Sequence, residues 1–111
     1  MSVQVVSEGA IGLEAFENCV VQIGYRIKNL DNDEMEGSPE GELVMKKLND
    51  PSAWEYCAIG HKIGTRLRVL VDENFQIVRS PNQQPYRRLS AVILNVIPPG
   101  TDLDGDNKQE S

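Results

Sequence analysis

Apolar side chains recur at every second position between residues 19 and 28, and this period restricts the fold more than any other feature of the sequence. One side of the segment carries Cys19, Val21, Ile23, Tyr25 and Ile27, while the other side is mainly polar. A period of two is typical of a β-strand with one buried side and one solvated side. We therefore expect an antiparallel sheet that covers a core with one of its faces.

Four further segments have the composition of strands, and polar or glycine-punctuated turns separate them. These segments are residues 3–6, 43–48, 65–71 and 87–97. In the third of them, Arg66 and Arg68 alternate with apolar residues, which again indicates one wet side. In the last, the apolar run from Ala91 to Leu94 is typical of a central strand covered on both faces.

One short helix is expected over residues 51–59. Asp50 can cap its start, Pro51 suits the first helical position, and Gly60 supplies a left-handed residue after its end. The helical spacing of apolar residues turns Trp54 toward the body of the domain. With about five strands, the predicted fold class is α+β, an antiparallel sheet curled around one short helix.

Length and charge restrict the organisation and the partners. The chain has 111 residues, enough for one domain, with 11 basic and 17 acidic side chains and a net charge of −6. This balance argues against nucleic acid and against anionic membranes as partners. We expect a monomeric domain over residues 1–100 and an acidic flexible tail over 101–111. The first residues lack the pattern of a signal peptide, so a cytoplasmic location is expected.

No catalytic or metal-binding motif is present in the sequence, and no cofactor or metal is expected. Cys19 and Cys57 stand 38 positions apart, which matches neither a zinc motif nor a redox motif. His61 is the one histidine of the chain. Trp54 and Tyr25 are open to two interpretations: they are core aromatics, or they form the floor and wall of a shallow apolar pocket.

Three stretches within residues 3–97 carry a family resemblance. They are Val3-Gln4-Val5, the segment 19–27 followed by Glu36-Gly37-Ser38-Pro39, and the segment 54–64. Together they resemble the FKBP-type peptidyl-prolyl isomerases, especially the SlyD-like branch. The third stretch is the most specific, because its residue types and its length both match. The resemblance implies a sheet of about five antiparallel strands around one short helix, in agreement with the pattern of the sequence.

The resemblance also implies an activity and a partner, namely isomerisation of prolyl bonds in a proline-containing peptide or protein segment. Rotation about a peptide bond has a barrier of ~18–20 kcal/mol because it breaks amide resonance. The twisted amide is less dipolar than the planar one, so a dry apolar pocket favours it without any nucleophile or cofactor.

By resemblance, four residues take the family's catalytic positions. Trp54 would form the aromatic floor, and Tyr25 would be the pocket tyrosine. Glu36 stands where the family usually has aspartate. Ile77 stands where a tyrosine of the family's flap donates a hydrogen bond to the substrate.

The remaining predicted contacts are walls of the substrate-binding pocket. They are Met35, Leu43 or Met45, Phe75 as the alternative to Ile77, and Ala91 in place of a phenylalanine. Several of these differ from the family pattern. Neither Ile77 nor Phe75 carries a hydroxyl, and Pro51 has no N–H to donate. The implied isomerase is therefore weak.

Two alternatives remain open. An FKBP-like binding or chaperone module would use the same apolar groove without accelerating rotation. The segments 25–31 and 59–64 are also loosely similar to the C-terminal domain of the GreA transcript-cleavage family, which would make the protein an RNA-polymerase interaction module.

Overall fold

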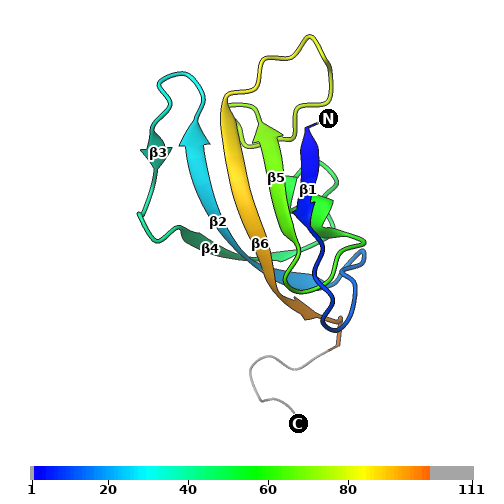
Figure 1. The fold of residues 1–111 in the computed structure, drawn as a ribbon. Coiled ribbons are helices and arrows are strands. Elements are labelled where there is room, and N and C mark those ends of the chain that lie inside the picture. The colour runs from blue at the N-terminus through cyan, green and yellow to red at the C-terminus, as the bar shows by residue number, and fades with distance from the viewer. Residues whose placement is uncertain (1, 101–111) are drawn as a thin grey trace.

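The computed structural model describes residues 2–100, which form one antiparallel sheet of six strands and one 3₁₀ turn (Figure 1). The strands are β1 (Val3–Ser7), β2 (Val20–Asn29), β3 (Met35–Glu36), β4 (Glu42–Lys47), β5 (Arg66–Val71) and β6 (Arg87–Ile97). The 3₁₀ turn η1 covers Trp54–Ala58. The predicted sheet is therefore present, with one strand more than expected.

The two longest strands, β2 and β6, pair with each other at the centre of the sheet. The order is β1-β5-β6-β2-β3, and β4 also pairs with β2. Because β3 and β4 follow one another along the same edge of β2, the connection between them forms the left margin in Figure 1.

The inner face of the sheet, defined here as the face that covers the core, carries the predicted alternate residues. Side chains at alternate positions are fully or almost fully buried in β2, β5 and β6, among them Val21, Ile23, Val69, Leu89 and Ile93. Residues 48–64, which include η1, pack on this face and lie behind β5 and β1 in Figure 1. The opposite side is called the outer face below.

The helix predicted over residues 51–59 is reduced to the five-residue turn η1. Asp50 does not cap it. One carboxylate oxygen of Asp50 instead accepts hydrogen bonds from the backbone N–H and the hydroxyl of Ser52, at 3.0 and 2.7 Å. This local turn competes with helix formation, and the remaining segment is too short to sustain an α-helix by itself. Gly60 has the predicted positive φ, +90°.

The prediction that β6 is covered on both faces is wrong. β6 is central, because it pairs with β5 on one edge and β2 on the other. Its side chains nevertheless alternate, so that Leu89, Ala91 and Ile93 are buried while Ser90 and Leu94 are exposed. The consecutive apolar residues gave a misleading signal, since central pairing covers the edges of a strand and not its faces.

The described part of the chain contains no helix long and apolar enough to cross a membrane. The predicted acidic tail, residues 101–111, lies outside the described residues.

Candidate functional site

Trp54 and Tyr25 meet on the inner face of the sheet. Their rings pack edge to face, with 5.1 Å between centroids and 65° between planes, an arrangement that aromatic quadrupoles favour. Trp54 begins η1 and is only 6% exposed, while Tyr25 is half-buried in β2. Ala91 of β6 lies directly opposite Tyr25 in the strand register and is buried. The two aromatic residues singled out by sequence are thus in contact.

A cavity of about 290 Å³ opens beside Trp54. Two segments enclose it, one leading into η1 and one from the loop after β5, and an antiparallel bridge between Ala53 and Gln76 joins them. The lining residues are Asp50, Ser52, Ala53, Trp54, Glu55, Asn74, Phe75 and Gln76. The lining is therefore mainly polar and includes two aromatic residues, Trp54 and Phe75.

Phe75 reaches this cavity because the loop around it is held in an unusual conformation. Its φ is +62°, in the left-handed region that costs roughly 1–2 kcal/mol for a residue with a side chain. Asp72 holds the loop: one of its carboxylate oxygens accepts from the backbone N–H groups of Asn74 and Gln76, at 2.8 and 3.0 Å. The N–H of Phe75 also donates to the carbonyl of Asp72, at 3.0 Å. These bonds offset the strain at Phe75.

Arg87, which no sequence motif singled out, connects Phe75 to the predicted site residue Glu36. The Arg87 Nε donates to both carboxylate oxygens of Glu36, each at 3.1 Å. Its guanidinium carbon lies 4.6 Å from the ring centre of Phe75 and 4.7 Å from that of Tyr86. Arg87 follows the inward alternation of Leu89 in β6, and that parity is the signal that could have identified it.

Tyr25 and Cys57, which belongs to η1, hold their protons more tightly than usual. Burial raises the pKa of the Tyr25 phenol, and the nearby carboxylates of Glu42 and then Glu55 raise it further. Burial raises the pKa of the Cys57 thiol to about 12, with a second contribution from Glu55. The Tyr25 hydroxyl is therefore a protonated donor at neutral pH, and Cys57 is no nucleophile.

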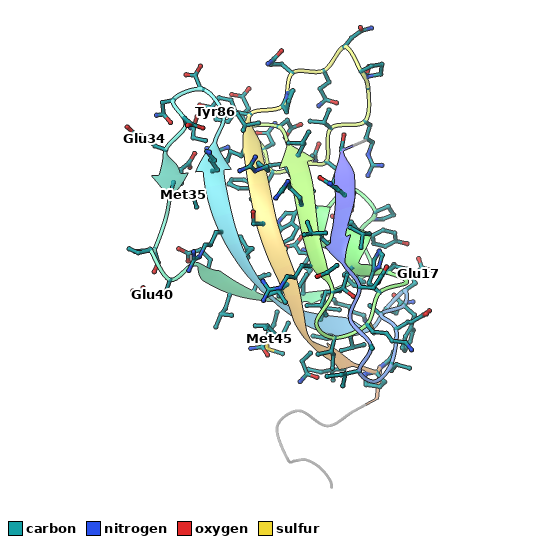
Figure 2. All side chains as sticks on the ribbon, in the orientation of Figure 1. Glu17, Glu34, Met35, Glu40, Met45 and Tyr86 are labelled. Atoms are coloured by element: carbon teal, nitrogen blue, oxygen red, sulfur yellow. The ribbon has the colours of Figure 1, made fainter. Side chains whose placement is uncertain are left out.

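The structure does not gather all of the predicted site residues. The predicted walls Met35, Leu43 and Met45 lie on the outer face, opposite Lys28, Gly24 and Gln22 of β2. They are 59%, 68% and 53% exposed, and Figure 2 shows Met35 and Met45 along the β3 and β4 margins of the sheet. Met35 and Leu43 line a second hollow together with Tyr25 and Ala91, whereas Met45 lines neither this hollow nor the cavity beside Trp54.

The two flap candidates also differ in position. Ile77 is half-buried, forms a bridge with Val71 and does not line the cavity, whereas Phe75 does. Among residues 2–100, no three His, Cys, Asp or Glu side chains gather closely enough to hold a metal ion.

Comparison with solved structures identifies the fold of this chain. No protein-family model matches the sequence, and no curated protein sequence matches it. Among solved structures, FkpA from Escherichia coli matches with a TM-score of 0.61 and 20% identity over 86% of this chain. The chain spans about half of FkpA, 47% of its length. The putative peptidyl prolyl cis-trans isomerase FKBP12 from Mycobacterium tuberculosis matches with a TM-score of 0.60 and 16% identity, over 85% of this chain and 82% of that one.

This chain has an FKBP-like fold. The FKBP-like antiparallel sheet that the sequence resemblance implied is thereby confirmed, whereas the implied helix is only the turn η1 and the assignment to the SlyD-like branch stays a prediction. The roles assigned to the individual site residues stay predictions as well.

Proposed function

We propose that this FKBP-like domain binds proline-containing protein segments in the cavity beside Trp54 and isomerises the prolyl bond weakly. The observation that carries the proposal is a cavity whose lining includes two aromatic residues, Trp54 and Phe75, of which Trp54 packs against Tyr25. A pyrrolidine ring is apolar and compact, and aromatic faces in a small hollow suit it. The strained loop that presents Phe75 supports a binding role, because such strain clusters at ligand sites.

The similarity to the putative prolyl isomerase from Mycobacterium tuberculosis supports the same class of ligand. It does so through the fold, while the sequence resemblance adds the motif from Trp54 to Gly64.

Three features argue that rotation is accelerated little. The flap residues Phe75 and Ile77 offer no hydroxyl, and one lost hydrogen bond costs about 0.5–1.5 kcal/mol, a rate factor of a few to ten. The indole of Trp54 is almost fully covered. The polar lining, which includes Asp50 and Asn74, keeps the mouth hydrated, and water favours the planar amide over the twisted one.

A fluorescence titration tests the binding. Trp54 is the sole tryptophan of the chain, so its emission reports on the cavity directly. We expect a saturable change of this emission with the peptide Ala-Leu-Pro-Phe. Replacing Phe75 by Ala should weaken the affinity about fivefold, since an aromatic contact contributes about 1 kcal/mol. Phe16→Ala is the matched control, because Phe16 is the other phenylalanine and does not line the cavity.

A two-dimensional exchange experiment separates binding from catalysis. Cross-peaks between the cis and trans forms of the peptide, at protein concentrations well below that of the peptide, mean catalysed rotation. Shifts of the Trp54 and Gln76 amide signals without cross-peaks mean binding alone and remove the isomerase part of the proposal. Absence of any saturable change, or equal affinity of the Phe75→Ala variant, overturns the proposal as a whole.

A further inference from the structure

The outer face of the sheet has a charge opposite to that of the whole chain. Its strand positions carry six basic side chains and no acidic one, as the strand register and the sequence together show. The six are Arg26, Lys28, Lys47, Arg66, Arg68 and Arg88. The chain as a whole has 17 acidic and 11 basic residues. More than half of the positive charge is therefore concentrated on one face of an acidic protein.

This face is hollowed, and the register explains why. Arg68, Ser90 and Arg26 stand in one row across β5, β6 and β2, and Arg66, Val92 and Gly24 stand in the next. In the first row the short side chain of Ser90 thus lies between two arginines whose strands are roughly 9–10 Å apart, which is two strand spacings. In the second row Val92 and Gly24, which are also short, lie beside Arg66. The resulting hollow has a volume of about 880 Å³.

The floor of the hollow is apolar. A Cβ atom on Gly24 would lie 3.3 Å from Leu94 Cδ1, 3.6 Å from Leu43 Cδ2 and 3.7 Å from Val92 Cγ1. Three aliphatic side chains from the two strands β4 and β6 therefore meet over this glycine. Leu43 and Leu94 are exposed although they are apolar, which leaves their surface available to a partner.

The arginines on the β5 side form no ion pair with any other residue that the structure describes. Within residues 2–100 the ion pairs are Lys28–Asp33, His61–Glu8 and Arg87–Glu36, and none of them includes Arg66 or Arg68. Both arginines are exposed at the hollow. The acidic lining residues, Glu40 and Glu42, lie at the far margin, on and beside the β3–β4 connection, where Figure 2 labels Glu40.

We propose that this outer-face hollow binds an acidic protein segment that carries aliphatic side chains. Its carboxylates would pair with Arg66 and Arg68, whose planar guanidinium groups suit carboxylates. Its aliphatic side chains would cover Leu43, Val92 and Leu94. The outward strand positions carry no aromatic side chain, and the ring of Tyr25, the one aromatic lining residue, packs against Trp54, which disfavours stacking of single-stranded nucleic acid. A flat membrane surface does not enter a hollow. The inference does not depend on the Trp54 cavity, which lies on the opposite face.

Fluorescence anisotropy with the labelled peptide Glu-Leu-Asp-Val-Glu-Leu-Asp tests the proposal. We expect saturable binding to the wild-type chain, weakening as salt is raised, because exposed ion pairs are screened. The double variant R66E/R68E should bind about tenfold more weakly or worse, since like charges then face the peptide. The control K46E/K62E changes the net charge equally at two lysines outside the hollow and should bind like the wild type.

Three results would overturn the proposal. The first is equal binding by the wild type and R66E/R68E. The second is equal affinity for a peptide in which serine replaces leucine and valine, which would show that the apolar floor contributes nothing. The third is displacement of the peptide by an oligothymidylate, or by phosphatidylserine vesicles, at lower concentration than by unlabelled peptide, which would assign the face to another anion.

Discussion

Cys57 shows how one side chain makes stability depend on pH. Its folded-state pKa of about 12 exceeds the roughly 8.5 of a free thiol, so folding favours the protonated form. This contribution is fully present below pH ~8.5 and is lost as the pH rises toward 12. We expect the free energy of unfolding to fall by on the order of 1 kcal/mol for each pH unit above about 8.5. Urea denaturation from pH 7 to 10 measures this.

The Cys57→Ala variant provides the comparison for that experiment. Alanine has no proton to lose, so its unfolding free energy should change less between pH 8.5 and 10 than that of the wild type. Parallel curves for the two proteins would contradict the assignment of the pH dependence to Cys57. Tyr25, whose pKa is also raised, contributes only at still higher pH because a free phenol titrates near 10.

The ion pair between Glu36 and Arg87 holds the guanidinium group of Arg87, which lies over the ring of the strained Phe75. Both side chains are partly buried, so the pair is screened less than a surface pair. Glu36→Gln keeps the shape and removes the charge, and we expect a loss of about 1 kcal/mol in urea denaturation. Glu34→Gln is the matched control, an exposed residue two positions away that forms no ion pair within residues 2–100. An equal effect of both variants would show that the Glu36–Arg87 pair contributes nothing specific.

At the scale of elements, the sequence predicts which side chains of a strand share a face, because this depends on the strand alone. The period of two in β2 correctly placed Val21, Ile23 and Ile27 in the core, because alternation is a property of the strand itself. The face of β4 could not be predicted in the same way. Leu43 and Met45 point outward because β4 pairs with β2 in one register, and a shift by a single residue would turn them inward.

The residues of the candidate site also fall into two groups, those that local sequence patterns identify and those that matter only through contacts made on folding. Trp54 and Tyr25 were identified from a motif and a parity, and they do meet. Asp72 and Arg87 were missed, because their importance lies in contacts that chain folding creates. Asp72 matters through hydrogen bonds in its own loop, and Arg87 matters through Glu36, which is 51 positions away.

The loop after β5 is the element on which the proposed binding site depends. Asp72→Ala removes the acceptor of two backbone hydrogen bonds and should free Phe75 from its strained position. We expect a loss of stability of about 1 kcal/mol and several-fold weaker binding of the proline peptide, measured by Trp54 fluorescence. Asp72→Asn keeps an acceptor oxygen and should remain close to the wild type. If the Ala variant binds as the wild type does, the loop does not position Phe75 for binding.

At the scale of the molecule, net charge gave an incomplete picture of the partners. A value of −6 argues against anionic partners for a chain whose charges are evenly spread. Within residues 2–100 the fold separates the charges along the sheet, because every charged side chain at an outward position of β2, β4, β5 and β6 is basic, and Glu40 and Glu42 lie only at the margin of the hollow. Composition cannot reveal this separation, since it depends on which residues share a face.

The sheet has a proposed site on each face, and its rigidity predicts that the two sites act independently. Both faces share the strand pair β2 and β6, whose inward side chains form a packed core. Neither site needs this core to rearrange. A ligand that binds one face therefore does not favour a different conformation of the other face. We expect the acidic peptide to bind with the same affinity, within about twofold, in the absence and presence of saturating Ala-Leu-Pro-Phe. Anisotropy titrations under both conditions measure this ratio. A tenfold difference would show that the core has a second packing arrangement and that the FKBP-like sheet transmits a signal between its faces.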